Sequence, residues 1–210
     1  MPQAPKHIAV AGNIGAGKTT LVKKLAQHYR WKVLLESVDD NPYLADFYDD
    51  MQQWAFPLQI YFLNSRFQQM LEAQQNELPV IQDRTIYEDA YIFGKNLHQN
   101  QILSERDFNT YWGVYESMKA MITPPDLLIY LRASVPTLID QIAKRGRDYE
   151  QSISIKYLET LNRQYEAWIA QYQESRLLIL DADRIDYVSR AEDFGYVISR
   201  IDGEFFGLLS

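Results

Sequence analysis

The feature that most constrains this chain is a glycine-rich segment that follows the short apolar run Ile8-Ala9-Val10-Ala11. It matches the phosphate-loop pattern G-x-x-x-x-G-K-[ST] at every fixed position, reading Gly12-Asn13-Ile14-Gly15-Ala16-Gly17-Lys18-Thr19. Glycines in such a loop allow positive φ angles, so successive backbone N–H groups can point into one concavity that suits phosphate. The apolar run before the segment and the helical pattern after it supply the context that the motif needs. We predict a nucleoside triphosphate site here.

The residues of this loop have distinct expected roles. Lys18 brings a full charge to the outer phosphates, and the helix that starts near it adds the positive end of its dipole. Thr19 offers a hydroxyl to a magnesium ion. The predicted nucleotide-binding residues are Gly12, Asn13, Ile14, Gly15, Ala16, Gly17, Lys18, Thr19 and Thr20.

Composition limits the classes of partner. The 210 residues suit a single domain spanning 1–210, and the net charge of −7, with no basic block, argues against duplex nucleic acid as a partner. The absence of cysteine excludes disulfides and thiolate metal sites. No apolar run approaches the roughly 18 residues of a spanning helix, so we expect no membrane insertion and a cytoplasmic enzyme.

The order of apolar runs predicts an α/β fold. Five short runs rich in Val, Ile and Leu have little polar alternation, which is typical of strands buried on both faces, and helical patterns separate them. A five-stranded parallel sheet flanked by helices follows. The predicted strands are 8–11, 32–35, 80–83, 127–131 and 177–180. The predicted helices include 49–75, with a kink or a start near Pro57, then 88–97, 104–122, 134–147, 155–173 and 189–202.

Charged side chains follow two of these strands, at the edge of the sheet where the phosphate loop follows the first. Glu36 ends the second predicted strand, where a carboxylate can take a proton from an attacking hydroxyl. Asp83 and Arg84 end the third, where the acid can help Thr19 to hold magnesium and the arginine can meet phosphoryl oxygens. The segment Lys144-Arg145-Gly146-Arg147 fits a basic lid, or else a helix end whose cations are favoured by the dipole.

The chain lacks the Asn-Lys-x-Asp guanine reader of GTPases and the Leu-Ser-Gly-Gly-Gln signature of transporter ATPases. It resembles the deoxynucleoside kinase family, and within it the bacterial deoxyadenosine kinase group. The matching pieces run in the family's order through residues 8 to 150. They are residues 12–19, Glu36 with Asn41-Pro42-Tyr43-Leu44, Trp54 through Gln59 to Arg66, Asp83-Arg84-Thr85-Ile86-Tyr87-Glu88-Asp89, and Arg145-Gly146-Arg147.

The resemblance implies a P-loop kinase fold with a basic lid and a role for each matching residue. Glu36 is similar to the general base for the 5′-hydroxyl, and Arg84 to the arginine that contacts that base and the phosphoryl group. Asp83 stands where many relatives carry Glu, which leaves its magnesium role open. The substrate-binding residues implied are Glu36, Tyr48 and Glu150 at the sugar, Gln59 and Phe93 at the base, the pair Arg66 and Asp89 at the base edge, and Arg84. The donor-binding residues implied are Arg145 and Arg147 of the lid and Asp183, in an adenine-reading loop around 181–185.

The expected reaction is transfer of a phosphoryl group from ATP, with Mg²⁺, to the 5′-hydroxyl of a 2′-deoxynucleoside in nucleoside salvage. The resemblance favours deoxyadenosine, while deoxycytidine and deoxyguanosine stay open. Asp89 could accept from an exocyclic amine, which suits deoxyadenosine or deoxycytidine. The alternatives are a nucleoside monophosphate kinase similar to thymidylate kinase, and a nucleotide-dependent switch. The resemblance also implies a homodimer.

Overall fold

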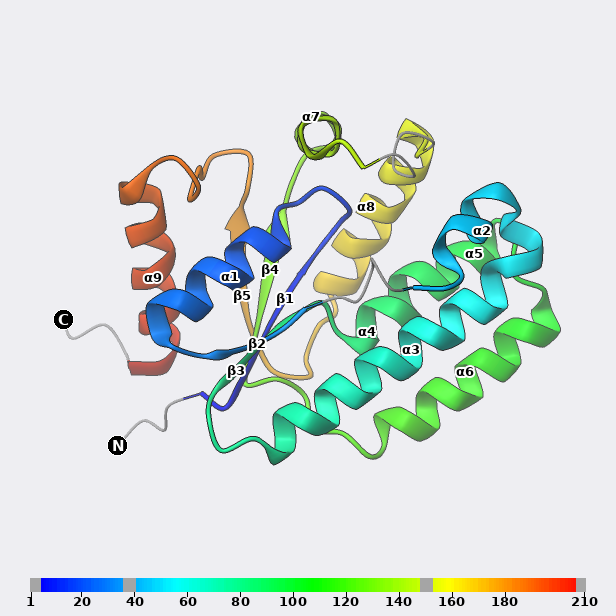
Figure 1. Ribbon diagram of the computed structural model, residues 1–210, viewed down its shortest axis with the longest axis horizontal. Helices are drawn as coiled ribbons and strands as arrows, with labels where there is room; N and C mark the ends of the chain where they lie inside the picture. Colours follow the sequence, from blue (N-terminus) through cyan, green and yellow to red (C-terminus); the bar gives the residue numbers. More distant parts are fainter. Residues whose placement is uncertain (1–4, 36–40, 148–152, 207–210) are drawn as a thin grey trace.

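A five-stranded parallel sheet forms the centre of the fold (Figure 1). The computed structural model describes residues 5–35, 41–147 and 153–206. The strands are hydrogen-bonded in the order β2-β3-β1-β4-β5, so the chain crosses over between neighbours that are not consecutive. Their bounds are β1 (His7–Gly12), β2 (Lys32–Leu34), β3 (Val80–Asp83), β4 (Leu127–Arg132) and β5 (Arg176–Asp181). The predicted α/β fold is confirmed, and each predicted strand agrees with an observed strand to within one residue at either end.

The two faces of the sheet carry different helices. Ile8 and Val10 of β1 belong to a buried cluster with α1 (Lys18–Tyr29) and α9 (Ala191–Phe206), whereas Ala9 belongs to a second cluster on the other face. Successive side chains of a strand point to opposite faces, which is why a continuous apolar run fills both clusters. The second cluster includes residues of α8 (Ile155–Ile169), which lies on the other side of the sheet from α1 in Figure 1.

The remaining helices form a layer beyond the second face and a short arm over the phosphate loop. Helices α3 and α6 lie side by side at the outside of this layer (Figure 1). Their bounds, with those of the other elements, are α2 (Leu44–Asp49), α3 (Met51–Gln75), α4 (Ile86–Glu88), η1 (Asp89–Gly94), α5 (Lys95–Gln99), α6 (Glu105–Lys119) and α7 (Val135–Arg145).

Several predicted helix bounds differ from the structure by up to four residues, and two of the differences have a clear local cause. Helix α3 begins at Met51, not at Pro57, because the Asp50 side chain caps it by accepting from the Gln53 N–H at 3.1 Å. The predicted helix 88–97 begins two residues earlier, at Ile86, where Thr85 and Glu88 form a capping box. Its centre, Asp89–Gly94, is π-helical. Such turns are rare and occur frequently at functional sites.

None of the helices within the described ranges combines the length and the apolar character needed to cross a bilayer.

Candidate active site

The phosphate loop takes the backbone form that its glycines predict. Gly15 and Gly17 have φ angles of +86° and +93°, in the left-handed region that a side chain disfavours. A Cβ atom at Gly15 would lie 2.7 Å from the carbonyl oxygen of Leu138, and one at Gly17 would collide with the Tyr187 hydroxyl. The Lys18 ammonium donates to the Asn13 carbonyl at 3.0 Å and is buried. The backbone of the loop and the position of its lysine are thus set by contacts within the chain.

Asn13 ties this loop to α8. Its side-chain amide donates to the Asn162 side chain at 2.6 Å and to the Leu158 carbonyl at 3.1 Å, and its oxygen accepts from the Ile14 N–H at 2.8 Å. Asn162 in turn donates to the Ala133 carbonyl at 2.8 Å. The Asn13 side chain is therefore used to hold the loop, so a contact with a nucleotide is left to its backbone.

Thr19 and Asp83 meet at the start of α1, as a shared magnesium site requires. The Thr19 hydroxyl donates to Asp83 Oδ2, while Asp83 Oδ1 is buried and has no hydrogen-bond partner within the described ranges. One carboxylate and one hydroxyl beside a phosphate site are a donor set that Mg²⁺ accepts, because waters and substrate phosphates complete its octahedron. No group of three or more acidic, His or Cys side chains that could hold a metal occurs among residues 5–35, 41–147 and 153–206. The residues present therefore fit a nucleotide-bound magnesium ion.

Arg84 is held in an unusual backbone conformation directly behind the phosphate loop. Its φ of +70° is uncommon for a residue with a side chain, and its N–H donates to the Val10 carbonyl at 3.0 Å. Its guanidinium donates to the Gly12 carbonyl at 3.4 Å and lies 4.6 Å from the centre of the Phe93 ring. Such strain persists only where the surroundings fix the residue, and it is common in active sites.

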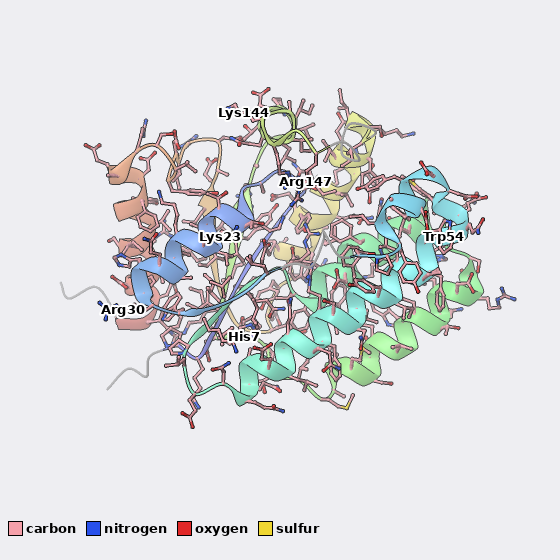
Figure 2. The ribbon with its side chains drawn as sticks, in the orientation of Figure 1. His7, Lys23, Arg30, Trp54, Lys144 and Arg147 are labelled. Carbon is pink, nitrogen blue, oxygen red and sulfur yellow. The ribbon has the colours of Figure 1, made fainter. Side chains whose placement is uncertain are left out.

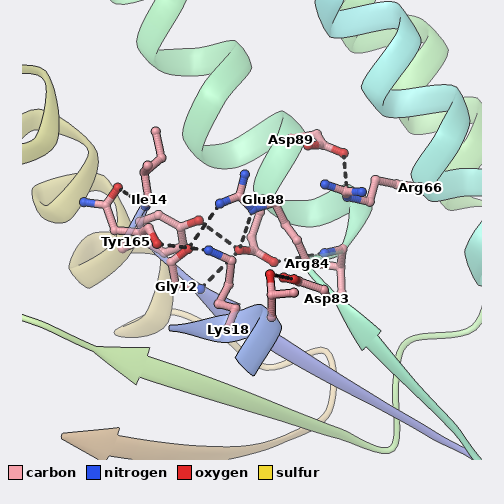
Figure 3. A network of polar contacts seen from close by, with 12 residues as sticks. Gly12, Ile14, Lys18, Arg66, Asp83, Arg84, Glu88, Asp89 and Tyr165 are labelled. Atoms are coloured by element: carbon pink, nitrogen blue, oxygen red, sulfur yellow. Dashed lines mark hydrogen bonds and ion pairs between the residues drawn. The ribbon is translucent and has the colours of Figure 1, made fainter. Parts of the chain in front are cut away.

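Glu88 lies beneath the loop at the centre of a buried network (Figure 3). Its Oε1 accepts from the Tyr165 hydroxyl at 2.8 Å and from the Gly12 N–H at 3.3 Å, and its Oε2 accepts from the Thr85 N–H at 2.9 Å. Burial raises the pKa of Glu88, and the charges of Arg84 and Lys18 oppose that rise. The Tyr165 hydroxyl and the N–H groups of Gly12 and Thr85 all donate to the carboxyl, which is the pattern expected of an ionised carboxylate.

A cavity of about 530 Å³ opens from the phosphate loop toward α2, α3 and η1. Its volume is in the range of small-molecule sites. Five of its lining residues are predicted substrate contacts, namely Tyr48, Gln59, Arg84, Asp89 and Phe93, and Lys18 lines it as well. Gln59 is buried, and its Oε1 has no hydrogen-bond partner within the described part of the chain, as expected of a group that awaits a ligand donor.

Arg66 lies behind this cavity and does not line it. It is fully buried, and its Nε lies 3.8 Å from Asp89 Oδ2 (Figure 3). The predicted pair of Arg66 and Asp89 is therefore present. Asp89 faces the cavity and Arg66 supports it from behind.

The basic segment lies over the other end of the cavity. Lys144, Arg145 and Arg147 all line it, and Figure 2 shows Lys144 and Arg147 near the end of α7, over the start of α1. Helix α7 ends at Gly146, whose φ of +67° gives the left-handed cap that suits glycine. The cap turns the chain so that cations on both sides of Gly146 border one cavity.

Asp183, predicted to lie in the donor-base loop, is outside the residues that line this cavity. Its Oδ1 accepts from the Ser134 N–H at 3.0 Å, which fixes the start of α7. Partial burial raises the pKa of Asp183, but the hydrogen bonds from Ser134 and Thr137 outweigh it and lower the pKa below its ordinary value. A donor-binding role for Asp183 stays a prediction. Glu36 and Glu150 lie outside the described residues, and their roles also stay predictions.

No functional role was predicted from the sequence for Glu88 or for Tyr165. The Tyr165 ring lies in the core, but its hydroxyl belongs to the Glu88 network. A sequence signal for Glu88 exists, because Thr85-Ile86-Tyr87-Glu88 matches the capping-box pattern. No local pattern marks the hydroxyl of Tyr165, which is 77 residues from its acceptor.

Comparison with known proteins gives one consistent result. The family model described as deoxynucleoside kinase matches residues 8–206. The deoxyadenosine/deoxycytidine kinase of Bacillus subtilis (strain 168) is 37% identical over 203 residues, which are 94% of this chain and 93% of that protein. The deoxyadenosine kinase of Dictyostelium discoideum is 42% identical over 163 residues, which are 78% of this chain and 66% of that protein. Deoxyadenosine kinase from M. mycoides with bound dATP superposes with a TM-score of 0.83 at 32% identity, covering 93% of this chain and 99% of that chain.

Proposed function

The chain belongs to the deoxynucleoside kinase family, and we propose that it transfers the terminal phosphoryl group of ATP to the 5′-hydroxyl of deoxyadenosine. The observation that carries the proposal is the continuity of one cavity, which runs from Lys18 and Thr19 to Gln59, Asp89 and Phe93. A triphosphate at the loop and a nucleoside at the far end would thus share one enclosed volume. Positioning of this kind supplies much of the catalysis in phosphoryl transfer.

The proposed chemistry assigns the phosphate end to fixed positive charge. Lys18 and the loop N–H groups bind the donor phosphates, and Arg84 with the lid arginines Arg145 and Arg147 stabilises charge on the transferred group. Thr19 and Asp83 hold Mg²⁺, which would screen the phosphate charges. Substitution Asp83→Asn is expected to raise the Mg²⁺ concentration needed for half-maximal activity, and an unchanged requirement would remove Asp83 from the metal site.

The base preference follows from the acceptor that faces the cavity. Asp89 accepts from an exocyclic amine, and Gln59 has both a donor and an acceptor to offer to the edge of a purine. These groups suit deoxyadenosine, and deoxycytidine has an amine as well. The comparisons support the range of bases and not one base, because relatives named for deoxyadenosine, deoxycytidine and deoxyguanosine all match most of this chain.

The test is an assay of purified protein with ATP and Mg²⁺ over the four deoxynucleosides, their ribose counterparts and their 5′-monophosphates. We expect the highest kcat/KM with deoxyadenosine and weaker use of adenosine, since Tyr48 and Glu150 are proposed to pack at the sugar. Preferential use of thymidine would overturn the base assignment. Preferential use of a monophosphate would favour a thymidylate-kinase-like enzyme, and ATP hydrolysis unaffected by any nucleoside would favour a switch.

Glu36 is proposed as the general base, on the strength of its place after the second strand and of the family resemblance. Substitution Glu36→Gln is expected to lower kcat by roughly 10²–10⁴ while ATP binding stays intact. Turnover equal to that of the wild type would remove this role. The homodimer and the cytoplasmic location are proposals from the sequence, and the mass of the protein in solution tests the first.

A further inference from the structure

Glu88 is an immobilised carboxylate. Its three hydrogen bonds come from three separate parts of the chain, the end of β1 at Gly12, the residue after Arg84, and the middle of α8 at Tyr165. Two of the donors are backbone N–H groups, which cannot rotate away as side chains do. Burial raises the pKa of the Tyr165 hydroxyl well above its ordinary value, so the third donor keeps its proton at any working pH. The carboxylate is therefore fixed on both oxygens.

The same carboxylate faces Arg84. Glu88 Oε1 lies 3.6 Å from Arg84 Nε, and both side chains are almost completely buried. The other face of the guanidinium has the Phe93 ring at 4.6 Å, and Nη2 reaches the Gly12 carbonyl at 3.4 Å. A long side chain that leaves a left-handed backbone has many alternative rotamers, and these contacts restrict it to the one that lines the cavity.

We propose that Glu88 is a positioning residue that holds Arg84 in its catalytic orientation, and that Tyr165 acts through Glu88. The inference rests on the role of Arg84 in the proposed function. A buried charge pair by itself is weak evidence of stabilisation, since desolvation costs are large. The three hydrogen bonds instead fix the position of Glu88, so Glu88 can hold the Arg84 guanidinium in one orientation. This arrangement serves the alignment of Arg84 more than the stability of the fold.

The first test compares single variants in steady-state kinetics with ATP and deoxyadenosine. Glu88→Gln removes the negative charge beside Arg84 and places an amide NH₂ group against an N–H donor. We therefore expect kcat to fall about tenfold or more, while the KM for nucleoside changes by less than about threefold. Tyr165→Phe removes one of three anchors, so we expect a smaller, severalfold loss of kcat. Wild-type kcat in Glu88→Gln would overturn the proposal.

Tyr130→Phe is the matched control. The Tyr130 ring stacks on that of Tyr165 at 5.8 Å between centroids, and its hydroxyl donates to Glu166 at 3.0 Å, not to Glu88. Like Tyr165→Phe, this variant removes one hydroxyl oxygen from the stacked pair of Tyr130 and Tyr165, and we expect unchanged kcat. Equal losses in Tyr130→Phe and Tyr165→Phe would overturn the role of Tyr165, because they would report only damage to the stack.

The decisive measurement is a double-mutant cycle by single-turnover kinetics. If Glu88 acts through Arg84, then Glu88→Gln lowers the rate by less than about twofold in an Arg84→Ala background, although it lowers it about tenfold or more in the wild type. The full loss in both backgrounds would overturn the proposal. Where Glu88→Gln does not fold, Tyr165→Phe takes its place in the cycle: its severalfold loss should disappear in the Arg84→Ala background, and the same loss in both backgrounds would overturn the proposal.

The cycle also separates this inference from the proposed function. Arg84→Ala with wild-type turnover would contradict the catalytic role of Arg84 itself. A slow Arg84→Ala beside a fully active Glu88→Gln would contradict only the positioning role.

Discussion

The cavity has a buried arginine–carboxylate pair at each end, and the two acids are consecutive residues. At the phosphate end Arg84 Nε lies 3.6 Å from Glu88, and at the nucleoside end Arg66 Nε lies 3.8 Å from Asp89. The two pairs are alike in separation and burial but opposite in arrangement. The arginine lines the cavity in the first pair, and the acid lines it in the second.

The contrast indicates which member of each buried pair would contact a ligand in the proposed function. Glu88 is bound by backbone N–H groups and lies out of the cavity lining, so it acts as the support and Arg84 as the working group. Arg66 lies behind Asp89, so there the cation is the support and the carboxylate is the working group. In the proposed function the phosphate end therefore presents a donor to an anion, and the nucleoside end presents an acceptor to an amine.

The largest effect is expected from the working group of the phosphate pair. Arg84→Ala should lower kcat about 10³-fold, because an arginine on the transferred phosphoryl group stabilises charge that develops only in the transition state. Steady-state kinetics with separate titration of ATP binding checks this. A rise in KM at constant kcat would mean that Arg84 binds the ground state only, and the contrast between the two pairs would fail.

The working group of the nucleoside pair should alter selectivity more than turnover. Asp89→Asn is expected to lower kcat/KM for deoxyadenosine about 10²-fold, because it weakens the acceptor and removes the buried negative charge that lies 3.8 Å from Arg66. Its free energy of unfolding should fall by about 3 kcal/mol for the second reason. The kcat/KM values for all four deoxynucleosides check it. Equal losses for all four would show that Asp89 does not read the base.

Gln59 should give a smaller change in the same direction. Gln59→Leu preserves bulk but removes the buried oxygen that has no partner in the described ranges, so kcat/KM for deoxyadenosine should fall about tenfold. Arg84→Ala should lower kcat far more than Gln59→Leu does. Similar losses of kcat would indicate that both ends of the cavity act in the chemical step.

The smallest effect on activity is expected from His7, a buried titratable group with a neutral partner, at the other end of the molecule from α7 (Figure 2). Burial lowers its pKa to about 4, although Gln82 and Asp126 oppose the shift. Between pH 6.5 and about 4 the unfolded chain binds a proton there that the folded chain excludes. The free energy of unfolding should therefore fall by up to about 3 kcal/mol as the pH drops through that range.

Denaturant titrations at several pH values, with His7→Gln as the comparison, measure this contribution. The variant should show a flatter pH dependence and unchanged kcat at neutral pH. An identical pH dependence in both proteins would show that His7 is not protonated selectively in the unfolded chain.

Most of the fold could be predicted because its signals are local. The strands are apolar runs, and the phosphate loop is specified by glycines whose φ angles the structure confirms at Gly15 and Gly17. The meeting of Thr19 with Asp83 was also predictable, since parallel strands bring their carboxyl ends to one edge.

What escaped prediction depends on distant partners. Glu88 is 76 residues from Gly12, so no pattern of neighbours indicates that the two bond. Asn13 was assigned to the ligand because the motif contains it, yet its side chain bonds α8, almost 150 residues away. The π-helical turn also has no sequence signature here, because packing against other elements decides it.

That turn has a consequence for anyone who recombines this enzyme with others. Asp89–Gly94 carries both the acid and the ring of the nucleoside end, and it begins at the residue next to Glu88. Deleting one residue there would convert the wide turn to the ordinary 3.6-residue pitch and would change which side chains of the segment face the cavity. Chimaeras and loop grafts should keep the number of residues in this segment even where its amino acids change, because the residue count sets the direction in which Phe93 points.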